Sequence, residues 1–124
     1  VNEYSARGTW SNSTRAAQAV IAKIYSSPEL LQKVDEERTQ CRDMLVRRGK
    51  AFEKAAEEVG LAIVPFDSGF FASVPCANAE EVGQKLQKEG IFAVPLAKGL
   101  RISVASIPES ACSMLPARIL EAMK

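Results

Sequence analysis

Residues 90–106 read GIFAVPLAKGLRISVAS, and this stretch decides the fold class. Residues 91–96 and 100–106 are two short apolar runs rich in strand-forming side chains, and the dipeptide Lys98-Gly99 between them is a turn signal. The stretch therefore predicts two strands joined by a turn.

Toward the N-terminus the same pattern occurs once more, before a helix. Residues 61–65 and 69–75 are short, apolar and typical of strands, and the turn signal Phe66-Asp67-Ser68-Gly69 separates them. Asn78-Ala79-Glu80-Glu81 then has the pattern of a capping box, which opens a helix that runs to Glu89 and is ended by Gly90. We expect four short strands, in two pairs, with one helix between the pairs.

Two further helices are predicted before these strands. In residues 14–26 the apolar side chains recur at helical spacing, and Ser27-Pro28-Glu29 then has the pattern of a new helix start. This second helix keeps its apolar period to residue 59 and ends at Gly60. It would be roughly 48 Å long, whereas a globule of this size is about 30 Å across. We therefore expect it to project beyond the core or to bend near Gly49, and a second body to lie against it.

A last helix is predicted over residues 108–123, capped by Ser106-Ile107-Pro108-Glu109 and kinked by Pro116. The order of the elements predicts an α+β fold, with a small, mostly antiparallel sheet, helices on one face and one long helix near the N-terminus. We expect residues 14–124 to form one domain. Residues 1–13 are polar and are expected to be an entry segment from a missing large domain.

The composition excludes several classes of function. The 124 residues contain 16 Lys and Arg against 15 Asp and Glu, so the net charge of +1 gives no field that attracts nucleic acid or acidic membranes. The histidine count is 0, which excludes Ser–His–Asp and Cys–His catalysis and His₂Cys₂ zinc sites. Gly-rich phosphate motifs are also absent from the sequence. We expect no catalytic residue and no metal site in this chain.

The cysteines indicate a reducing compartment. Cys41, Cys76 and Cys112 are odd in number, far apart and outside any CxxC spacing, so we expect three free thiols and no disulfide. No apolar stretch approaches the roughly 20 residues of a membrane span, and the first residues do not resemble a secretory signal. We therefore expect a cytoplasmic protein. The first residue is Val1 rather than Met, and we expect the chain to be part of something longer.

Arg101 is the first candidate for a binding residue. It lies within the predicted strand 99–105, on the face that carries Ser103 and Ala105 and opposite the face of Leu100. A guanidinium among small neighbours suits a carboxylate, because its planar fork matches two oxygens. Two other interpretations stay open at this point: an edge-strand arginine that points into solvent, or one paired with a glutamate of a helix.

Other candidates lie near the N-terminus and in the first pair of strands. Arg7 precedes Trp10-Ser11-Asn12-Ser13 before a helix, where such groups can bind an anion, although simple N-capping by Asn12 or Ser13 explains them equally. Phe70-Phe71 either belongs to the core or lines a pocket. We interpret the charged runs 35–38 and Arg47-Arg48 as the solvated face of the long helix.

Five segments, in order, resemble the C-terminal part of the aspartate and aromatic amino-acid aminotransferases, which are pyridoxal-phosphate (PLP) enzymes of fold type I. They are RGTWSN at 7–12, SPEL at 27–30, SGFF at 68–71, GIFAV at 90–94 and LRISVA at 100–105. Three positions depart from the family pattern: Ser13 where proline is usual, Ser103 where asparagine is common, and Ser106 where glycine is common.

The resemblance implies a role for each matched residue. Arg101 would bind the α-carboxylate of the substrate, and Phe71 would contact the bound substrate. Arg7 would bind the side-chain carboxylate of a dicarboxylic substrate in the active site of the neighbouring subunit of a homodimer, with Ser11 and Asn12 near that site. Two arginines facing the two ends of a dicarboxylate would fix its orientation.

The resemblance also implies what the whole enzyme does. It would transfer an amino group between an amino acid, either aspartate or an aromatic one, and a 2-oxo acid such as 2-oxoglutarate. The lysine that holds PLP and the rest of the phosphate site would lie outside this chain, and the chain alone would be inactive. The alternative is a free-standing, non-catalytic α+β module that binds a small ligand or a protein.

Overall fold

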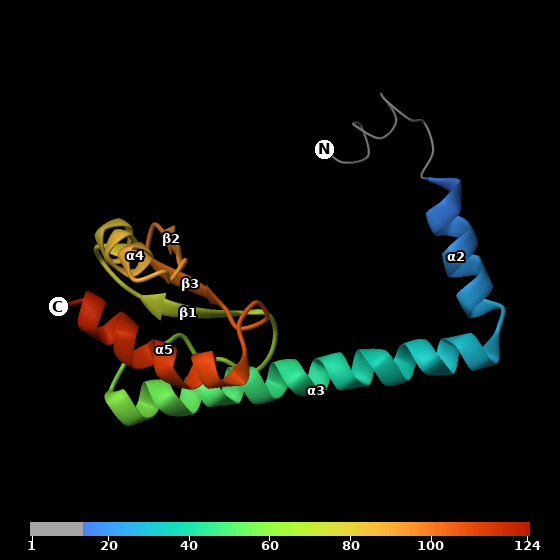
Figure 1. Ribbon diagram of the computed structural model, residues 1–124, viewed down its shortest axis with the longest axis horizontal. Coiled ribbons are helices and arrows are strands. Elements are labelled where there is room, and N and C mark those ends of the chain that lie inside the picture. Colours follow the sequence, from blue (N-terminus) through green and yellow to red (C-terminus); the bar gives the residue numbers. More distant parts are fainter. Residues whose placement is uncertain (1–13) are drawn as a thin grey trace. The chain divides into compact units, whose positions relative to one another are not determined.

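The computed structural model describes residues 14–124, and these divide into two compact units, one ending at Gln40 and the other comprising Cys41–Lys124. Figure 1 labels the elements along the chain. The helices and strands are α2 (Arg15–Tyr25), α3 (Pro28–Val59), β1 (Phe71–Pro75), α4 (Ala79–Lys88), β2 (Val94–Leu96), β3 (Gly99–Ser103) and α5 (Glu109–Ala122).

The unit that ends at Gln40 contains α2 and the first turns of α3. The predicted start of α3 is confirmed, since the Leu30 amide donates a hydrogen bond of 3.4 Å to Ser27 Oγ. No residue of α2 is buried, and Val20 and Ile21 on its apolar face are each more than half exposed. The described residues of this unit therefore leave the apolar face of α2 exposed.

The unit Cys41–Lys124 is built on a three-stranded sheet with the order β1-β3-β2. Both pairs are antiparallel, as predicted, and β3 is the central strand. The registers align Ser73 and Val94 with Arg101 from the two sides. These elements confirm the α+β class and the small antiparallel sheet.

The two faces of this sheet differ in burial. Ala72 and Val74 of β1 and Leu100 and Ile102 of β3 are buried, whereas the alternate residues of both strands, apart from Gly99, are half-buried or exposed. Because side chains alternate across a strand, the buried residues share one face, which belongs to the core. We call the opposite face the open face; its central row is Ser73, Arg101 and Val94.

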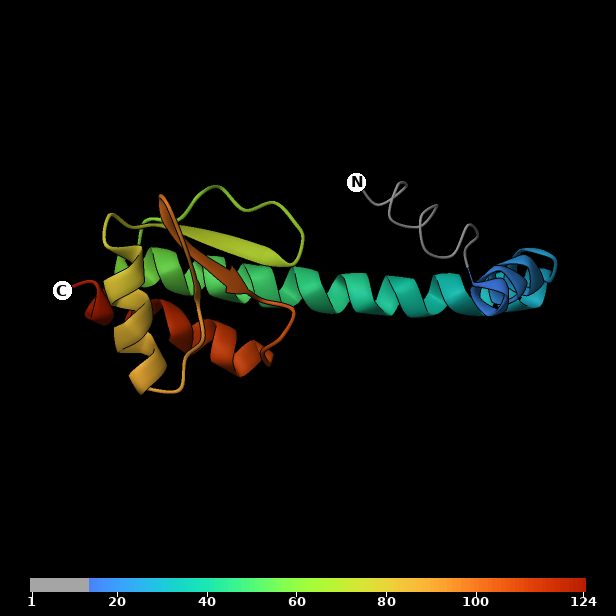
Figure 2. The same cartoon turned by 90° about the horizontal axis from the view of Figure 1, so that it is seen from above.

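Three helices supply the other half of the core. Phe52 and Ala56 of α3, Val82 and Leu86 of α4, and Cys112 and Ile119 of α5 join the strand residues in one buried cluster. Figures 1 and 2 show α5 beside the C-terminal half of α3 on one side of the sheet. The helices thus cover one face and leave the open face free of helices within this unit.

The remaining predictions about the elements are confirmed in part. α3 runs without interruption from Pro28 to Val59, and Gly60 and Gly90 follow α3 and α4 with positive φ, as expected of helix-ending glycines. That a second body lies against α3 stays a prediction. Among residues 14–124, no helix is long and apolar enough to cross a membrane.

Several local predictions are wrong. Residues 61–65 do not form a strand, although the Val64 amide donates a hydrogen bond of 2.9 Å to the Ser73 carbonyl. A single bond of this kind leaves the segment beside β1 without continuing the ladder. The connection between β2 and β3 is Ala97-Lys98, so Gly99 is the first residue of β3 rather than part of the turn.

The predicted side-chain caps of the last two helices are also wrong. Asn78 and Pro108 occupy the N-cap positions of α4 and α5, and neither makes a side-chain cap hydrogen bond. Ser106 Oγ instead donates to the Ser103 carbonyl over 3.1 Å, within the connection that follows β3. The Ser106 hydroxyl, which the sequence pattern predicted as a cap of α5, therefore bonds within the preceding connection instead.

Candidate carboxylate-binding site

Arg101 lies at the middle of the central strand, on the open face. Across β1 its partner is Ser73, and across β2 its partner is Val94. These neighbours carry no charge, so the guanidinium is the only ionic group in its row. The interpretation as an edge-strand arginine is wrong, because β3 is paired on both sides.

An aromatic ring fixes the guanidinium from one side. Phe71 pairs with Ser103, which places it diagonally across from Arg101 on the same face. The guanidinium carbon of Arg101 lies 4.6 Å from the centre of the Phe71 ring. A guanidinium over an aromatic face is attracted by the ring quadrupole and loses part of its rotational freedom. The structure therefore brings together two of the predicted site residues.

The Arg101 Nε atom is buried and has no hydrogen-bond partner within the described part of the chain. None of the ion pairs formed among residues 14–124 includes Arg101, so the interpretation as an arginine paired with a helix glutamate is also wrong. A buried charged donor without an acceptor is costly, and an anion with two oxygens would satisfy it. Chemically, such an arrangement can bind a carboxylate.

Apolar side chains flank Arg101 on the open face. Phe71, Val94 and Leu96, which the strand registers place on this face, are each between 42% and 49% exposed. An apolar surround lowers the local polarity and strengthens an arginine–carboxylate contact. Contiguous exposed apolar side chains are also typical of a surface that another part of a protein covers.

A second arginine, in α3, binds the backbone just beyond the end of β3. Arg48 of α3 is half-buried, and its Nη1 donates a hydrogen bond of 2.9 Å to the Ala105 carbonyl. The prediction that Arg48 belongs to a solvated helix face is therefore wrong. A sequence signal existed, since Arg48 is three residues after Leu45 and four before Phe52, on the apolar side of the helix. Arg47 fits the prediction better: it is exposed and forms an ion pair of 3.6 Å with Glu109.

The other predicted site residues, Arg7, Ser11 and Asn12, lie outside the described residues. The structure brings none of them into view, and their roles stay predictions. Among residues 14–124, no cluster of three or more Cys, Asp and Glu could hold a metal ion.

Cys41, Cys76 and Cys112 are all free, as expected. Cys41 is exposed, whereas Cys76 and Cys112 are buried. Burial raises the pKa of the Cys112 thiol; the positive charge of Arg48 acts in the opposite direction and the negative charge of Glu109 adds to the rise. The Cys112 thiol is thus held in its neutral form and behaves as a small apolar core residue.

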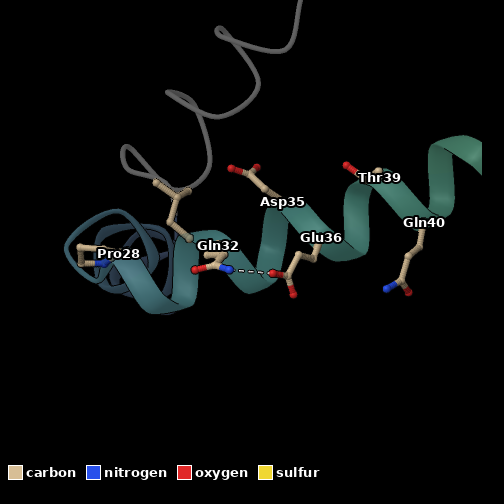
Figure 3. A pocket seen from close by; sticks show the side chains of 7 residues that line it. Pro28, Gln32, Asp35, Glu36, Thr39 and Gln40 are labelled. Carbon is tan, nitrogen blue, oxygen red and sulfur yellow. Dashed lines mark hydrogen bonds between the residues drawn. The ribbon is translucent and has the colours of Figure 1, made fainter.

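A groove along the first turns of α3 has a different character (Figure 3). Pro28, Leu31, Gln32, Asp35, Glu36, Thr39 and Gln40 line it. Gln32 Nε2 donates a hydrogen bond of 2.8 Å to Glu36 Oε1. None of the described residues that line the groove carries a positive charge, whereas Asp35 and Glu36 carry negative ones.

The lysines are the residues through which a chain could be bonded to PLP. All lysines of the sequence fall within residues 14–124, and every one of them is exposed. That the lysine which holds PLP lies outside this chain stays a prediction.

Comparison with known proteins identifies the family. Residues 4–119 match the family described as aminotransferase class I and II. An aminotransferase from Anaerococcus prevotii DSM 20548 has a similar structure, with 33% sequence identity and a TM-score of 0.89 over 98% of this chain and 29% of that one. An aromatic aminotransferase from Pyrococcus horikoshii OT3 is similar in fold, with 21% identity and a TM-score of 0.60 over 81% of this chain and 29% of that one. The comparison with curated proteins gives no match.

The chain spans less than a third of the length of these two enzymes. Its match to the family nevertheless covers most of its own residues, including the two strands that carry Phe71 and Arg101. The chain therefore belongs to the class I and II aminotransferases and forms part of such an enzyme.

Proposed function

We propose that this chain is the small C-terminal domain of a PLP-dependent aminotransferase and that it binds the α-carboxylate of the substrate through Arg101. The single observation that carries the proposal is the buried, unpartnered Arg101 Nε on the central strand, beside the Phe71 ring. A guanidinium whose Nε the fold has buried without providing an acceptor is best explained by an anion that arrives with the substrate.

The whole enzyme transfers an amino group from an amino acid to a 2-oxo acid such as 2-oxoglutarate. PLP, when bound, supplies the electron sink for this chemistry. The residues of this chain do not carry it out; Arg101 orients the substrate and the apolar open face excludes water from the contact. The chain alone is expected to be inactive.

The amino donor is aspartate or an aromatic amino acid. Arg7 binds the distal carboxylate of a dicarboxylic substrate in the active site of the neighbouring subunit, with Ser11 and Asn12 close by. This assignment requires a homodimer, and we propose that the homodimer is cytoplasmic. Free thiols at all three cysteines support a reducing compartment.

The test is a kinetic comparison of variants in the full-length enzyme. Arg101→Ala should weaken every amino-acid and 2-oxo-acid substrate, because all of them carry the α-carboxylate. Losing one partner of a buried charged contact typically costs about 2–5 kcal/mol, or roughly 30-fold to several thousand-fold in kcat/KM. Arg101→Lys should recover only part of the loss, since an ammonium cannot bind two oxygens in parallel.

Arg42→Ala is the matched control, because Arg42 is an exposed arginine whose ion-pair partner is the adjacent Asp43. Its kcat/KM should stay within two-fold of the unchanged enzyme. Equal kcat/KM for Arg101→Ala and Arg42→Ala would remove the proposed role of Arg101.

A free-standing binding module is the second candidate, and the uncovered receptor on the open face is the observation that favours it. Titration of the 124-residue chain with aspartate and with phenylalanine separates the two. A module should bind one of these ligands by itself, whereas a domain that holds only half of the site should not bind either at millimolar concentration.

A further inference from the structure

A continuous series of contacts connects α3 to the guanidinium of Arg101. Arg48 Nη1 donates to the Ala105 carbonyl over 2.9 Å, just beyond the end of β3. The preceding residue, Val104, donates its amide to the Phe70 carbonyl over 2.9 Å. Phe70 is followed by Phe71, whose ring lies against Arg101.

These contacts are found where the strand ladder has already ended. β3 ends at Ser103, and the last residue pair between β1 and β3 at this end is Phe71 with Ser103. The backbone from Val104 to Ala105 therefore depends on bonds outside the ladder for its position. Among residues 14–124, Arg48 donates the one side-chain hydrogen bond that reaches Ala105 from a distant element.

The donor is suited to hold a backbone carbonyl in place. Arg48 is half-buried, so its hydrogen bond is partly shielded from water, and a hydrogen bond from a charged donor contributes more than a neutral one. The neighbouring Arg47 is exposed and contacts the side chain of Glu109, the first residue of α5, rather than the backbone. Arg48 can therefore hold the backbone that follows β3 in position, whereas Arg47 contacts only an exposed side chain.

We propose that Arg48 is a positioning residue for substrate binding: by holding the Ala105 carbonyl it fixes the Val104–Phe70 contact, and thereby the Phe71 ring that orients Arg101. This inference rests on the proposed role of Arg101 as the α-carboxylate receptor. The inference adds Arg48, which does not touch the substrate but sets the geometry of Arg101, which does.

The experiment is a double-mutant cycle in the full-length enzyme loaded with its cofactor. Single-turnover rates at increasing amino-acid concentration give the apparent dissociation constant and the maximal rate separately, and enzyme in excess keeps slow variants measurable. The variants are Arg48→Met, which keeps the apolar stem and removes the donor, and Arg47→Met as the matched control. Each is made with Arg101 intact and with Arg101→Ala.

Arg48→Met should raise the apparent dissociation constant about five-fold when Arg101 is present, with the maximal rate unchanged within two-fold. It should have no further effect when Arg101 is replaced by alanine. Arg47→Met should change neither value more than two-fold in either background. Arg48→Lys, which keeps the charge on a different stem, should give a smaller rise and serves if the methionine variant does not fold.

The failures are distinguishable. A rise that is the same in both backgrounds would mean that Arg48 supports the fold generally, and it would overturn the inference. So would an unchanged dissociation constant for both Arg48 variants. If Arg101→Ala itself leaves the dissociation constant unchanged, the proposed function fails, and the inference fails with it.

Discussion

The guanidinium of Arg101 lies over the ring of Phe71, with 4.6 Å between the guanidinium carbon and the ring centre, although the two residues belong to different strands. The contact between a guanidinium and an aromatic ring uses none of the N–H donors as a conventional hydrogen bond. These donors are the part of arginine that binds a carboxylate with two parallel hydrogen bonds. The contact thus orients Arg101 without providing an acceptor for its donors.

Phe71→Leu should weaken substrate binding, because the leucine side chain cannot provide the cation–π contact that orients Arg101. The expected loss is about 0.5–1 kcal/mol, or a two- to five-fold rise in KM. Phe71→Tyr retains the aromatic face and should leave KM nearly unchanged. Steady-state kinetics with one amino donor checks this, and a leucine variant with the same KM as the tyrosine variant would contradict it.

Arg7→Ala should separate substrates by their distal group. For dicarboxylic substrates it should raise the activation free energy by about 2–5 kcal/mol and so lower kcat/KM, because it removes one partner of a charged contact. The kcat/KM for aromatic amino acids should stay unchanged. The measurement is kcat/KM for aspartate and for phenylalanine in the same preparation. Equal losses for both substrates would refute the assigned role of Arg7.

Gly49→Ala should destabilise the chain although it replaces glycine within a helix. In an open helix this change stabilises by about 1 kcal/mol. Here a methyl group at Gly49 would collide with the ring of Phe66, which packs directly on this turn of α3. Overpacking of this kind costs about 1–3 kcal/mol, which outweighs the gain in helix propensity.

The control for Gly49 is the same change in a Phe66→Ala background, where the collision is absent and the substitution should become stabilising. Urea unfolding followed by circular dichroism gives both free energies. A destabilisation of equal size with and without the Phe66 ring would show that the ring is not the cause.

The stability of the chain should fall at alkaline pH through Cys112. Burial raises the pKa of this thiol in the folded chain above its value in the unfolded chain. Between the two values the folded state binds more protons than the unfolded state, so the free energy of unfolding decreases as the pH rises through this interval. Below the unfolded pKa the contribution is fully present.

Unfolding free energies measured from neutral to alkaline pH should therefore decline less steeply for Cys112→Ala than for the unchanged chain. Cys41→Ala is the matched control, because Cys41 is exposed, and it should leave the slope as it is. Identical slopes for all three proteins would contradict the prediction.

The regular elements could be predicted from the sequence because their signals are local. The helical period, the Ser27-Pro28-Glu29 start and the glycines that follow α3 and α4 each depend on neighbouring residues, and the structure confirms them. The strands were harder to delimit. Residues 61–65 have strand composition but lie in an irregular segment, since pairing depends on a distant partner that composition does not specify.

The surroundings of Arg101, the candidate carboxylate-binding residue, could be predicted only in outline. The alternation of side chains placed Arg101 on the face opposite Leu100, but the sequence left open whether β3 was an edge strand. The strand order in the structure decides this point. β3 pairs with β1 as well as with β2 and is therefore the central strand. The contribution of Arg48 was missed, since its partner is a backbone carbonyl far along the chain, and such contacts leave no pattern in the sequence.

The position of β3 between two strands that do not bond to each other has a consequence for synthesis on the ribosome. β1 and β2 leave the exit tunnel first, and neither has a partner within the sheet until β3 follows. An isolated strand has no ladder to hold it, so the sheet cannot assemble stepwise from its N-terminal end. The strand that completes the sheet is also the one that carries Arg101, so a nascent chain completes its sheet and positions Arg101 beside Phe71 in the same late event.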